Sequence, residues 1–180
     1  MEKEIIQRIQ QGDEKAFAKL YHLYAEYALR VAMAVTKSRA NAADAVQETF
    51  IRVYDHIDRF DLTKDFKPWF YRILLNECNR LMKKQGKMVA MSDYIDDQVR
   101  IANVDHHAFE QYEELYKAIE KLKDIHRIPI VLKYLKGFSD EEIAQILDLN
   151  VNTVKSRLFK ARNKLTKIIE KMKERGVGNG

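Results

Sequence analysis

The stretch from Phe138 to Arg162 constrains the fold most, because it has the pattern of two helices joined by a three-residue turn. Ser139 lies three residues before Glu142, and this spacing predicts a capping box at the start of the first helix. The turn is Asp148-Leu149-Asn150, and Asn150 can cap the second helix by accepting a hydrogen bond from a backbone amide two or three residues further on. So tight a connection is typical of a helix-turn-helix.

The second helix of this pair has an apolar side and a polar side. At about 100° per residue, one side carries Val151, Val154, Leu158, Ala161 and Leu165. The opposite side and the flanks carry Asn152, Thr153, Lys155, Ser156, Arg157, Lys160 and Asn163. Amides and hydroxyls of this kind read base edges in a major groove while Lys and Arg hold phosphates. A solvated charged face would share the pattern, but the short turn and the polar first turns favour a helix that reads duplex DNA.

Composition predicts an all-α protein, and the length allows one large domain or two small ones. The break in periodicity over residues 85–109 favours two small helical domains joined by a flexible linker. Only 6 glycines and 2 prolines occur in 180 residues. The net charge of +5, with a pI near 9.1, is unevenly spread. Cations outnumber anions by 16 to 12 up to Ala90 and by 12 to 6 from His126 onward, whereas anions prevail by 9 to 4 in between. Two basic ends around an acidic middle indicate two contacts with polyanions.

Several other classes of protein fit the sequence poorly. Cys78 is the single cysteine, which rules out an internal disulfide and a Cys-based zinc cluster, and we expect it to be a small buried hydrophobe. The five histidines are scattered, so we expect neither a metal nor a cofactor. The charged start Met1–Glu4 lacks the apolar core of a signal peptide, and no apolar run reaches about 18 residues. We therefore expect a cytoplasmic protein without membrane insertion.

The N-terminal half predicts three helices. The first starts at a cap on Asp13, runs through Thr36 and buries an apolar stripe that we interpret as core: Phe17, Leu20, Leu23, Tyr24, Tyr27, Ala28, Val31 and Val35. After a turn at 38–41, a second helix spans about 42–57 and buries Val46, Phe50, Val53, Tyr54 and Ile57. A loop over 58–67 then leads to a third helix that has Pro68 in its first turn and ends at Lys84.

A second face of the middle helix is acidic and contains one isoleucine. It comprises Asp44, Gln47, Glu48, Ile51 and Asp55. A single exposed apolar residue is unremarkable by itself. An apolar anchor among carboxylates is also what a contact with a basic protein partner looks like. The helix alone leaves both interpretations open.

The third helix combines a polar face with nearby aromatic residues. The face comprises Arg72, Asn76, Asn79, Arg80 and Lys83, and the rings are Phe60, Phe66, Trp69 and Tyr71. Unstacked single-stranded nucleic acid needs rings for its bases and cations for its backbone. The alternative is that Trp69 and the phenylalanines are buried core.

The remainder of the chain consists of a linker and short helices. Residues 85–109 are polar and acidic and lack periodicity, which predicts a linker between domains. A helix with Tyr112, Leu115, Ile119 and Leu122 is expected from Glu110, followed by a short helix over 126–136. The last helix is expected to continue through Met172, which makes 110–175 the second domain and 176–180 a disordered tail.

Three segments, in this order and spacing, resemble the extracytoplasmic-function (ECF) group of bacterial sigma factors in the sigma-70 family. They are Ala43–Phe50, Phe66–Asn76 and a set of residues between Gly137 and Arg162. The resemblance implies that residues 1–84 form sigma region 2 and residues 110–175 form region 4. It also implies that the chain binds core RNA polymerase, recognises −35 and −10 promoter elements and promotes DNA melting for transcription initiation. In that family polymerase performs the chemistry, so no enzyme is expected.

The resemblance further implies a role for each surface. The acidic face of the middle helix would dock on the β′ clamp helices of RNA polymerase. The Phe60–Phe66 loop and the polar face of the third helix would hold single-stranded −10 DNA with one base flipped out. The helix from Asn150 to Lys164 would read the −35 duplex, and the linker would run toward the RNA exit channel. The polymerase β flap and an anti-sigma factor are further implied partners.

One departure from the family pattern bears on DNA preference. The family places an aspartate four residues after the motif asparagine and an arginine three further on, where this chain has Arg80 and Lys83. The −10 sequence that this chain prefers therefore stays open. The implied role in −10 binding is unaffected.

Two other functions share part of the pattern. A self-sufficient helix-turn-helix regulator would have the same C-terminal helices with an N-terminal sensing or dimerising domain, and would need neither an acidic docking face nor a single-strand surface. An interaction protein, such as an anti-activator, would only resemble a DNA binder. It would show little salt dependence in DNA binding, because dependence on salt comes from phosphate contacts.

Overall fold

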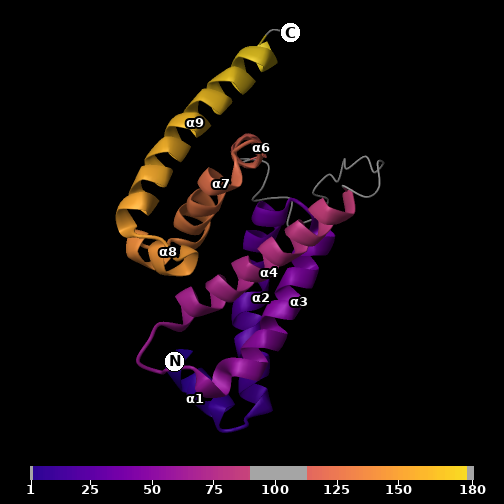
Figure 1. Cartoon of the computed structure of the whole chain (residues 1–180), viewed down its shortest axis with the longest axis vertical. Helices are drawn as coiled ribbons and strands as arrows, with labels where there is room; N and C mark the ends of the chain where they lie inside the picture. The colour runs from indigo at the N-terminus through magenta and orange to yellow at the C-terminus, as the bar shows by residue number, and fades with distance from the viewer. Residues whose placement is uncertain (1, 90–112, 178–180) are drawn as a thin grey trace. The chain divides into compact units, whose positions relative to one another are not determined.

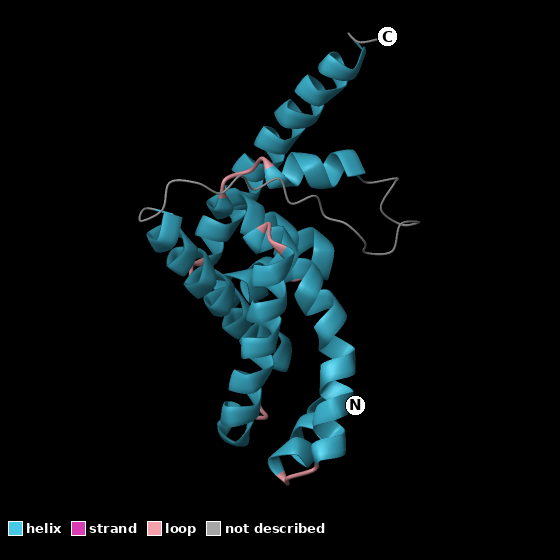
Figure 2. Ribbon diagram, turned by 90° about the vertical axis from the view of Figure 1, so that its right-hand side faces the viewer, coloured by secondary structure: helices cyan, strands magenta, loops and turns pink. Residues whose placement is uncertain are grey.

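The computed structural model describes residues 2–89 and 113–177, and every regular element in these two ranges is helical (Figure 2). The chain forms two compact units, the first containing α1 to α4 and the second containing α6, α7, η3, α9 and most of α8 (Figure 1). The predicted all-α fold with two small helical domains is confirmed. In the described residues no helix has the length and apolarity needed to cross a membrane.

The first unit is built on three long helices. Its elements are α1 (Glu2–Gln10), α2 (Glu14–Thr36), α3 (Arg39–His56), the 3₁₀ turn η1 (Ile57–Arg59) and α4 (Phe66–Val89). Helices α2, α3 and α4 pack against one another, while α1 lies against α2 and η1. Fully buried Leu20, Val53 and Leu74 come from the three long helices, one from each. Helix α1, which buries Ile6 and Ile9, was not predicted from the sequence.

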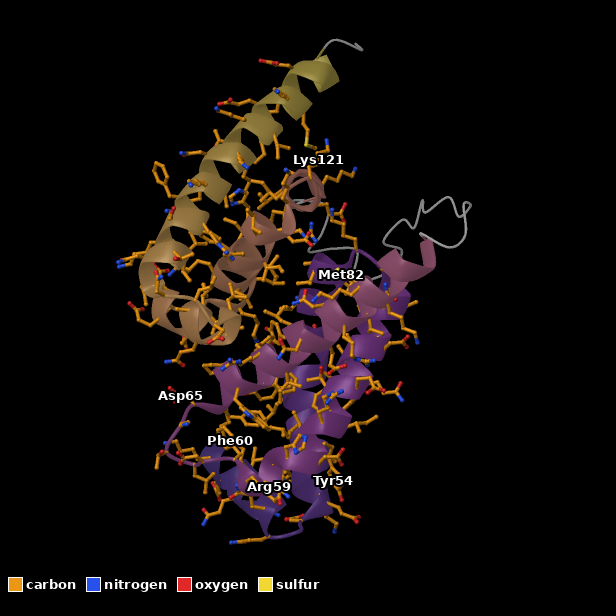
Figure 3. The ribbon with its side chains drawn as sticks, viewed as in Figure 1. Tyr54, Arg59, Phe60, Asp65, Met82 and Lys121 are labelled. Carbon is orange, nitrogen blue, oxygen red and sulfur yellow. The ribbon has the colours of Figure 1, made fainter. Side chains whose placement is uncertain are left out.

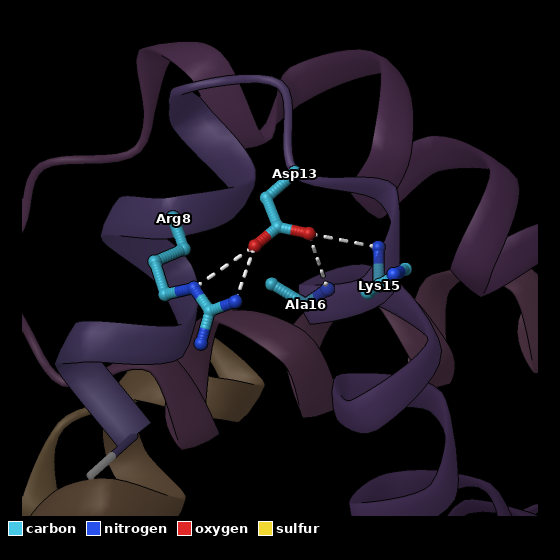
Figure 4. Close-up of polar contacts among 4 residues, drawn as sticks. All are labelled: Arg8, Asp13, Lys15 and Ala16. Carbon is cyan, nitrogen blue, oxygen red and sulfur yellow. Dashed lines mark hydrogen bonds and ion pairs between the residues drawn. The ribbon is translucent and has the colours of Figure 1, made fainter.

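Asp13 starts α2 as predicted (Figure 4). One carboxylate oxygen, Oδ1, accepts hydrogen bonds from the backbone amides of Lys15 at 3.0 Å and Ala16 at 3.2 Å. The other oxygen, Oδ2, accepts from Nε of Arg8 at 2.9 Å. The hydrogen bond from Arg8 and those from the amides hold the pKa of Asp13 below its usual value. The cap therefore ties the end of α1 to the start of α2.

Two predicted boundaries in this unit are wrong. Helix α3 begins at Arg39 rather than 42, because Ser38 caps it by accepting from the amide of Asn41 at 3.3 Å. Helix α4 continues to Val89 instead of ending at Lys84, so residues 85–89 belong to a helix and not to the linker. The remaining part of the predicted linker, 90–109, lies outside the described residues.

Three residues predicted to be core are exposed. Leu23 is 49% exposed, Tyr27 43% and Tyr54 56%. Leu23 and Tyr27 lie four residues apart on α2, along the border of the stripe that contains the buried Leu20 and Tyr24. The apolar stripe of the sequence is thus wider than the arc that α3 and α4 cover. Cys78 is buried as expected, and burial raises the pKa of its thiol to about 12.

The second unit packs short helices on one long helix. Its elements are α6 (Glu113–Glu120), α7 (Asp124–Ile130), the π-helix η3 (Val131–Leu135), α8 (Asp140–Leu147) and α9 (Val151–Val177). Helices α6 and α7 pack against α9. The helix predicted over 126–136 begins two residues earlier, and its second half is the π-helix. Residues 176–177 belong to α9 and not to a tail, while 110–112 and 178–180 lie outside the described residues.

The helix-turn-helix forms as predicted. The hydroxyl of Ser139 accepts from the amide of Glu142 at 3.1 Å, and Glu142 Oε2 accepts from the amide of Ser139 at 2.7 Å, which completes the capping box. Asp148 ends α8 in the left-handed region at φ 55°. Asn150 Oδ1 then accepts from the amide of Thr153 at 2.7 Å. Val154, Leu158 and Ala161 of α9 are buried.

Candidate polymerase and nucleic-acid interfaces

The acidic face predicted on the middle helix lies at the surface of α3. We call it the acidic helix face: Asp44, Gln47, Glu48, Ile51 and Asp55. Glu48 is partly exposed and the others are exposed, with Ile51 at 46%. Spacing of three and four residues along α3 places them together. An isoleucine this exposed contributes little to the core and can be covered by a partner.

An open groove of about 960 Å³ runs between α2 and α3 beside Ile51. Its apolar lining comprises Phe17, Tyr21, Ala25, Leu29, Ala43, Val46, Phe50, Ile51 and Tyr54, and Glu14, Glu26 and Gln47 add polar groups. The rings of Phe17 and Tyr54 lie 5.1 Å apart, and those of Tyr21 and Phe50 4.7 Å apart. The sequence does not predict this groove, because residues of two helices line it. An apolar trough with carboxylates nearby suits a basic amphipathic helix.

The polar face predicted on the third helix lies along α4. Arg72, Asn76, Asn79, Arg80 and Lys83 are all exposed. Arg80 is held by two acids: its Nε donates to Glu77 Oε2 at 2.7 Å, and its Nη2 lies 3.8 Å from Glu48 Oε2. These contacts, the Glu77 hydrogen bond above all, raise the pKa of Arg80. Glu77 is buried and also forms an ion pair with Arg52 of α3.

The aromatic residues at the start of α4 form a closed cluster. The ring centroids of Phe60, Phe66 and Trp69 lie 5.0 to 5.6 Å from one another. Phe66 is only 2% exposed, Phe60 9% and Tyr71 0%, whereas Trp69 is partly exposed. Phe60 and Phe66 fill the core beneath the loop, which is the alternative that the sequence left open. Their assignment to the −10 site stays a prediction.

The loop between η1 and α4 is braced by polar contacts. Arg59, Phe60 and Asp65 mark its course (Figure 3). Asp61 Oδ1 accepts from the amide of Thr63 at 2.9 Å and from its hydroxyl at 2.7 Å, and these bonds lower the pKa of Asp61. From α1, the side-chain amide of Gln10 donates to the carbonyl oxygens of Ile57 at 2.8 Å and Phe60 at 2.9 Å. The sequence does not predict these contacts of Gln10, because it does not predict helix α1.

The polar residues predicted for duplex DNA lie along the first turns of α9. Asn152, Lys155, Ser156 and Lys160 are exposed, and Thr153 and Arg157 are partly exposed. The structure adds Phe159, which is 60% exposed. Phe159 lies seven residues after Asn152 and three after Ser156, so the three share one side of the helix. Its position in the polar half of the helical pattern is the sequence signal for this exposure.

In the described part of the chain, no three or more His, Cys, Asp or Glu side chains are grouped so that they could hold a metal ion. The one buried histidine among these residues, His126, faces a cation instead. Its Nε2 lies 2.9 Å from Nζ of Lys164 in α9. Burial, and then the charge of Lys164, lower the pKa of His126.

Comparison with known proteins identifies the family of the chain. Residues 20–88 match the sigma-70 region 2 family, and residues 112–165 match the sigma-70 region 4 family. The ECF RNA polymerase sigma-E factor of Haemophilus influenzae is 33% identical over 180 residues, which cover 92% of this chain and 94% of that protein. The chain belongs to the ECF sigma factors. As a sigma factor it recognises promoters for RNA polymerase.

Other relatives of this sigma factor agree in sequence and in structure. The sigma-E factor of Escherichia coli is 33% identical over 174 residues, with 88% of each chain covered. The structure of the sigma factor RpoE with the anti-sigma factor NepR from Bartonella quintana superimposes with a TM-score of 0.77 at 29% identity, over 87% of this chain and 98% of that one. CnrH, solved with the cytosolic domain of CnrY, gives 0.73 at 25% identity over 94% and 97%.

Proposed function

We propose that this sigma factor divides promoter recognition among three helices, with α3 docking on core RNA polymerase, α4 holding single-stranded −10 DNA and α9 reading the −35 duplex. The proposal rests on the same placement of polar and apolar residues in all three helices. Each turns its predicted polar residues outward, fully or in part, while most of its apolar residues lie in the core; Ile51, Tyr54 and Phe159 are exposed. We take residues 1–84 and 110–175 as the corresponding regions 2 and 4.

The acidic helix face and the adjoining groove support docking on the β′ clamp helices. Ile51 lines the groove and also lies among the carboxylates of the acidic helix face. A basic helix could bury an apolar side chain against Ile51 while its cations meet Asp44, Glu48 and Asp55. Apolar anchors at the centre of an interface supply most of its affinity, and complementary charge selects the partner.

The exposed face of α4 and the loop before it support −10 binding. Asn76, Asn79 and Lys83 offer amides and a cation to a nucleic-acid strand, and Trp69 offers a partly exposed ring at the start of the helix. Phe60 and Phe66 support the loop from beneath. Capture of an unstacked base offsets part of the melting cost, which is a few kcal/mol per extruded base.

The first turns of α9 support −35 recognition. Asn152 and Ser156 can read base edges, and Lys155 and Lys160 can hold phosphates. Phe159 adds an exposed apolar group on the same side, and the methyl group of a thymine is the partner that such a ring finds in a major groove. The cap at Asn150 keeps this end of the helix in a fixed conformation.

We further propose that the chain works in the cytoplasm and carries out no catalysis of its own. Polymerase performs the chemistry, and the sigma factor supplies only binding. An anti-sigma factor is a further proposed partner, in keeping with the complex of its Bartonella quintana relative with NepR. The β flap of polymerase is a proposed partner of region 4.

A gel-shift comparison tests this function against an autonomous helix-turn-helix regulator. Purified chain is mixed with labelled promoter duplex, with and without core RNA polymerase, over a range of salt concentrations. We expect weak binding by the chain alone, tight binding after polymerase is added, and affinity that falls steeply with salt because phosphate contacts release counterions. Tight sequence-specific binding by the chain alone would instead favour the regulator.

A further inference from the structure

Helix α1 reaches the loop that precedes α4 through one side chain. Gln10 is partly buried at the end of α1, and its Nε2 atom donates to the carbonyl oxygens of Ile57 and Phe60 at 2.8 and 2.9 Å. The same Ile57 oxygen also accepts from the amide of Phe60 at 3.1 Å. Gln10 therefore clamps both ends of the η1 turn with a single amide group.

The clamp holds the backbone at the point where the loop between η1 and α4 begins. After Phe60 the chain leaves the helical turn and continues to Asp65, and the ring of Phe60 packs on Trp69 at 5.0 Å and Phe66 at 5.6 Å. A carbonyl fixed at Phe60 thus sets both the start of the loop and the position of the ring beneath Trp69. Backbone oxygens that lost this donor would need another partner or water.

We propose that Gln10 is a positioning residue for the −10 site. It touches no DNA and acts by fixing the Phe60–Asp65 loop against Trp69. The proposal rests on the −10 role put forward above, and it adds α1 to a site otherwise built from η1, the loop and α4. A preorganised loop discriminates between bases better than a flexible one, because a loop that can repack forms contacts with a wrong base as well as with the right one.

The variant that tests this is Gln10→Met, which keeps the length of the side chain and removes its donors. Gln7→Met, on an exposed glutamine of the same helix, is the matched control. A second variant, Gln10→Glu, places a carboxylate against the two carbonyl oxygens and decides the matter should Gln10→Met fail to fold. Trp69 is the chain's single tryptophan, so its fluorescence reports directly on the loop. We expect a red shift and easier quenching for both Gln10 variants and none for Gln7→Met.

The functional readout is selection of single-stranded DNA. Holoenzyme assembled from the full chain and core polymerase is incubated with a pool of single strands that have six random positions, and bound strands are sequenced. We expect the wild-type and Gln7→Met holoenzymes to enrich one motif. Both Gln10 variants should lose about tenfold in discrimination, which corresponds to about 1.4 kcal/mol. Assembly with polymerase should be unchanged.

The outcomes separate this inference from the proposed function. Equal discrimination by wild type and Gln10 variants, or an equal loss of affinity for every strand, would overturn the positioning role and leave the −10 role standing. A wild-type holoenzyme that enriches no strand would overturn the −10 role and the positioning role together.

Discussion

Arg80 and Glu77, three residues apart on α4, form an ion pair in which Nε of Arg80 lies 2.7 Å from Oε2 of Glu77. The carboxylate is almost fully buried, with its side chain 5% exposed, and it also pairs with Arg52 of α3. The two arginines are both close to half exposed. Glu77 thus pairs with two cations from beneath and joins α3 to α4, and Glu48 supplies a second carboxylate 3.8 Å from Arg80. Arg80 stands where the ECF pattern has an aspartate, and this pair explains how the fold accommodates a cation there.

Replacing Glu77 by Gln should destabilise the first unit by about 1–2 kcal/mol, because a buried carboxylate that pairs with two arginines becomes a neutral amide. Urea unfolding followed by the fluorescence of Trp69 measures the effect on this unit. Glu26→Gln is the control, since its pair with Arg30 is solvent-exposed and should contribute less than about 0.5 kcal/mol. Equal losses in the two variants would show that burial of Glu77 does not matter.

Ile51→Arg should abolish binding to core polymerase while the fold stays intact. The side chain is 46% exposed, so the core loses little, whereas a cation on the acidic helix face would repel the basic partner. Co-purification with polymerase measures binding, and circular dichroism measures the fold. Leu23→Arg is the matched control, because Leu23 is 49% exposed on α2 and does not line the groove. Retention of polymerase by Ile51→Arg would exclude the docking assignment.

Lys155→Ala should weaken binding to all promoters alike. It should also reduce the slope of log affinity against log salt concentration by about 1, because one phosphate contact is lost. Substitution of Asn152 or Ser156 by Ala should instead alter the −35 preference, because these side chains face base edges. Holoenzyme binding to a promoter library measures both effects. Lys167→Ala, further along α9 and equally exposed, serves as the control and should change neither. An unaltered preference in the Asn152 and Ser156 variants would count against the groove assignment.

His126 should make the second unit sensitive to acid. Its folded-state pKa is lowered by burial and by Lys164, whereas the unfolded state titrates near 6.5. The stabilisation from the neutral ring is therefore complete above about pH 6.5 and is lost as the pH falls below that value toward the folded pKa.

Urea unfolding of the second unit, followed by circular dichroism between pH 7.5 and 5, checks this pH dependence. The denaturation midpoint should fall with pH in the wild type, and the slope should be reduced in His126→Gln. His22→Gln, on an exposed histidine, should behave as the wild type. A slope that is the same in all three proteins would contradict the assignment.

Local chemistry explains which features of the fold the sequence predicts. The caps at Asp13, Ser139 and Asn150 depend on residues within three positions of the helix start, so the spacing alone reveals them. The faces of α3, α4 and α9 follow from helical periodicity in the same way. Helix α3 begins earlier than predicted because Ser38, in the expected turn at 38–41, caps the helix.

The features that the sequence did not predict depend on contacts between distant segments. The clamp from Gln10 to Ile57 and Phe60 spans 47 and 50 residues, and no local pattern signals it. The burial of Phe60 and Phe66 and the exposure of Tyr54 likewise depend on where neighbouring helices lie. Tyr54 lines the groove, and the centroid of its ring lies 5.1 Å from that of Phe17.

Run-off transcription tests the central claim most directly, namely that this chain guides polymerase by holding duplex DNA with one unit and opened DNA with the other. Core polymerase, the chain and a pool of templates with randomised −35 and −10 positions are combined, and the templates that give transcripts are sequenced. The account predicts transcripts that depend on the chain and come from templates enriched at both elements. Absence of transcripts from every template, or enrichment at the −35 element alone, would contradict it.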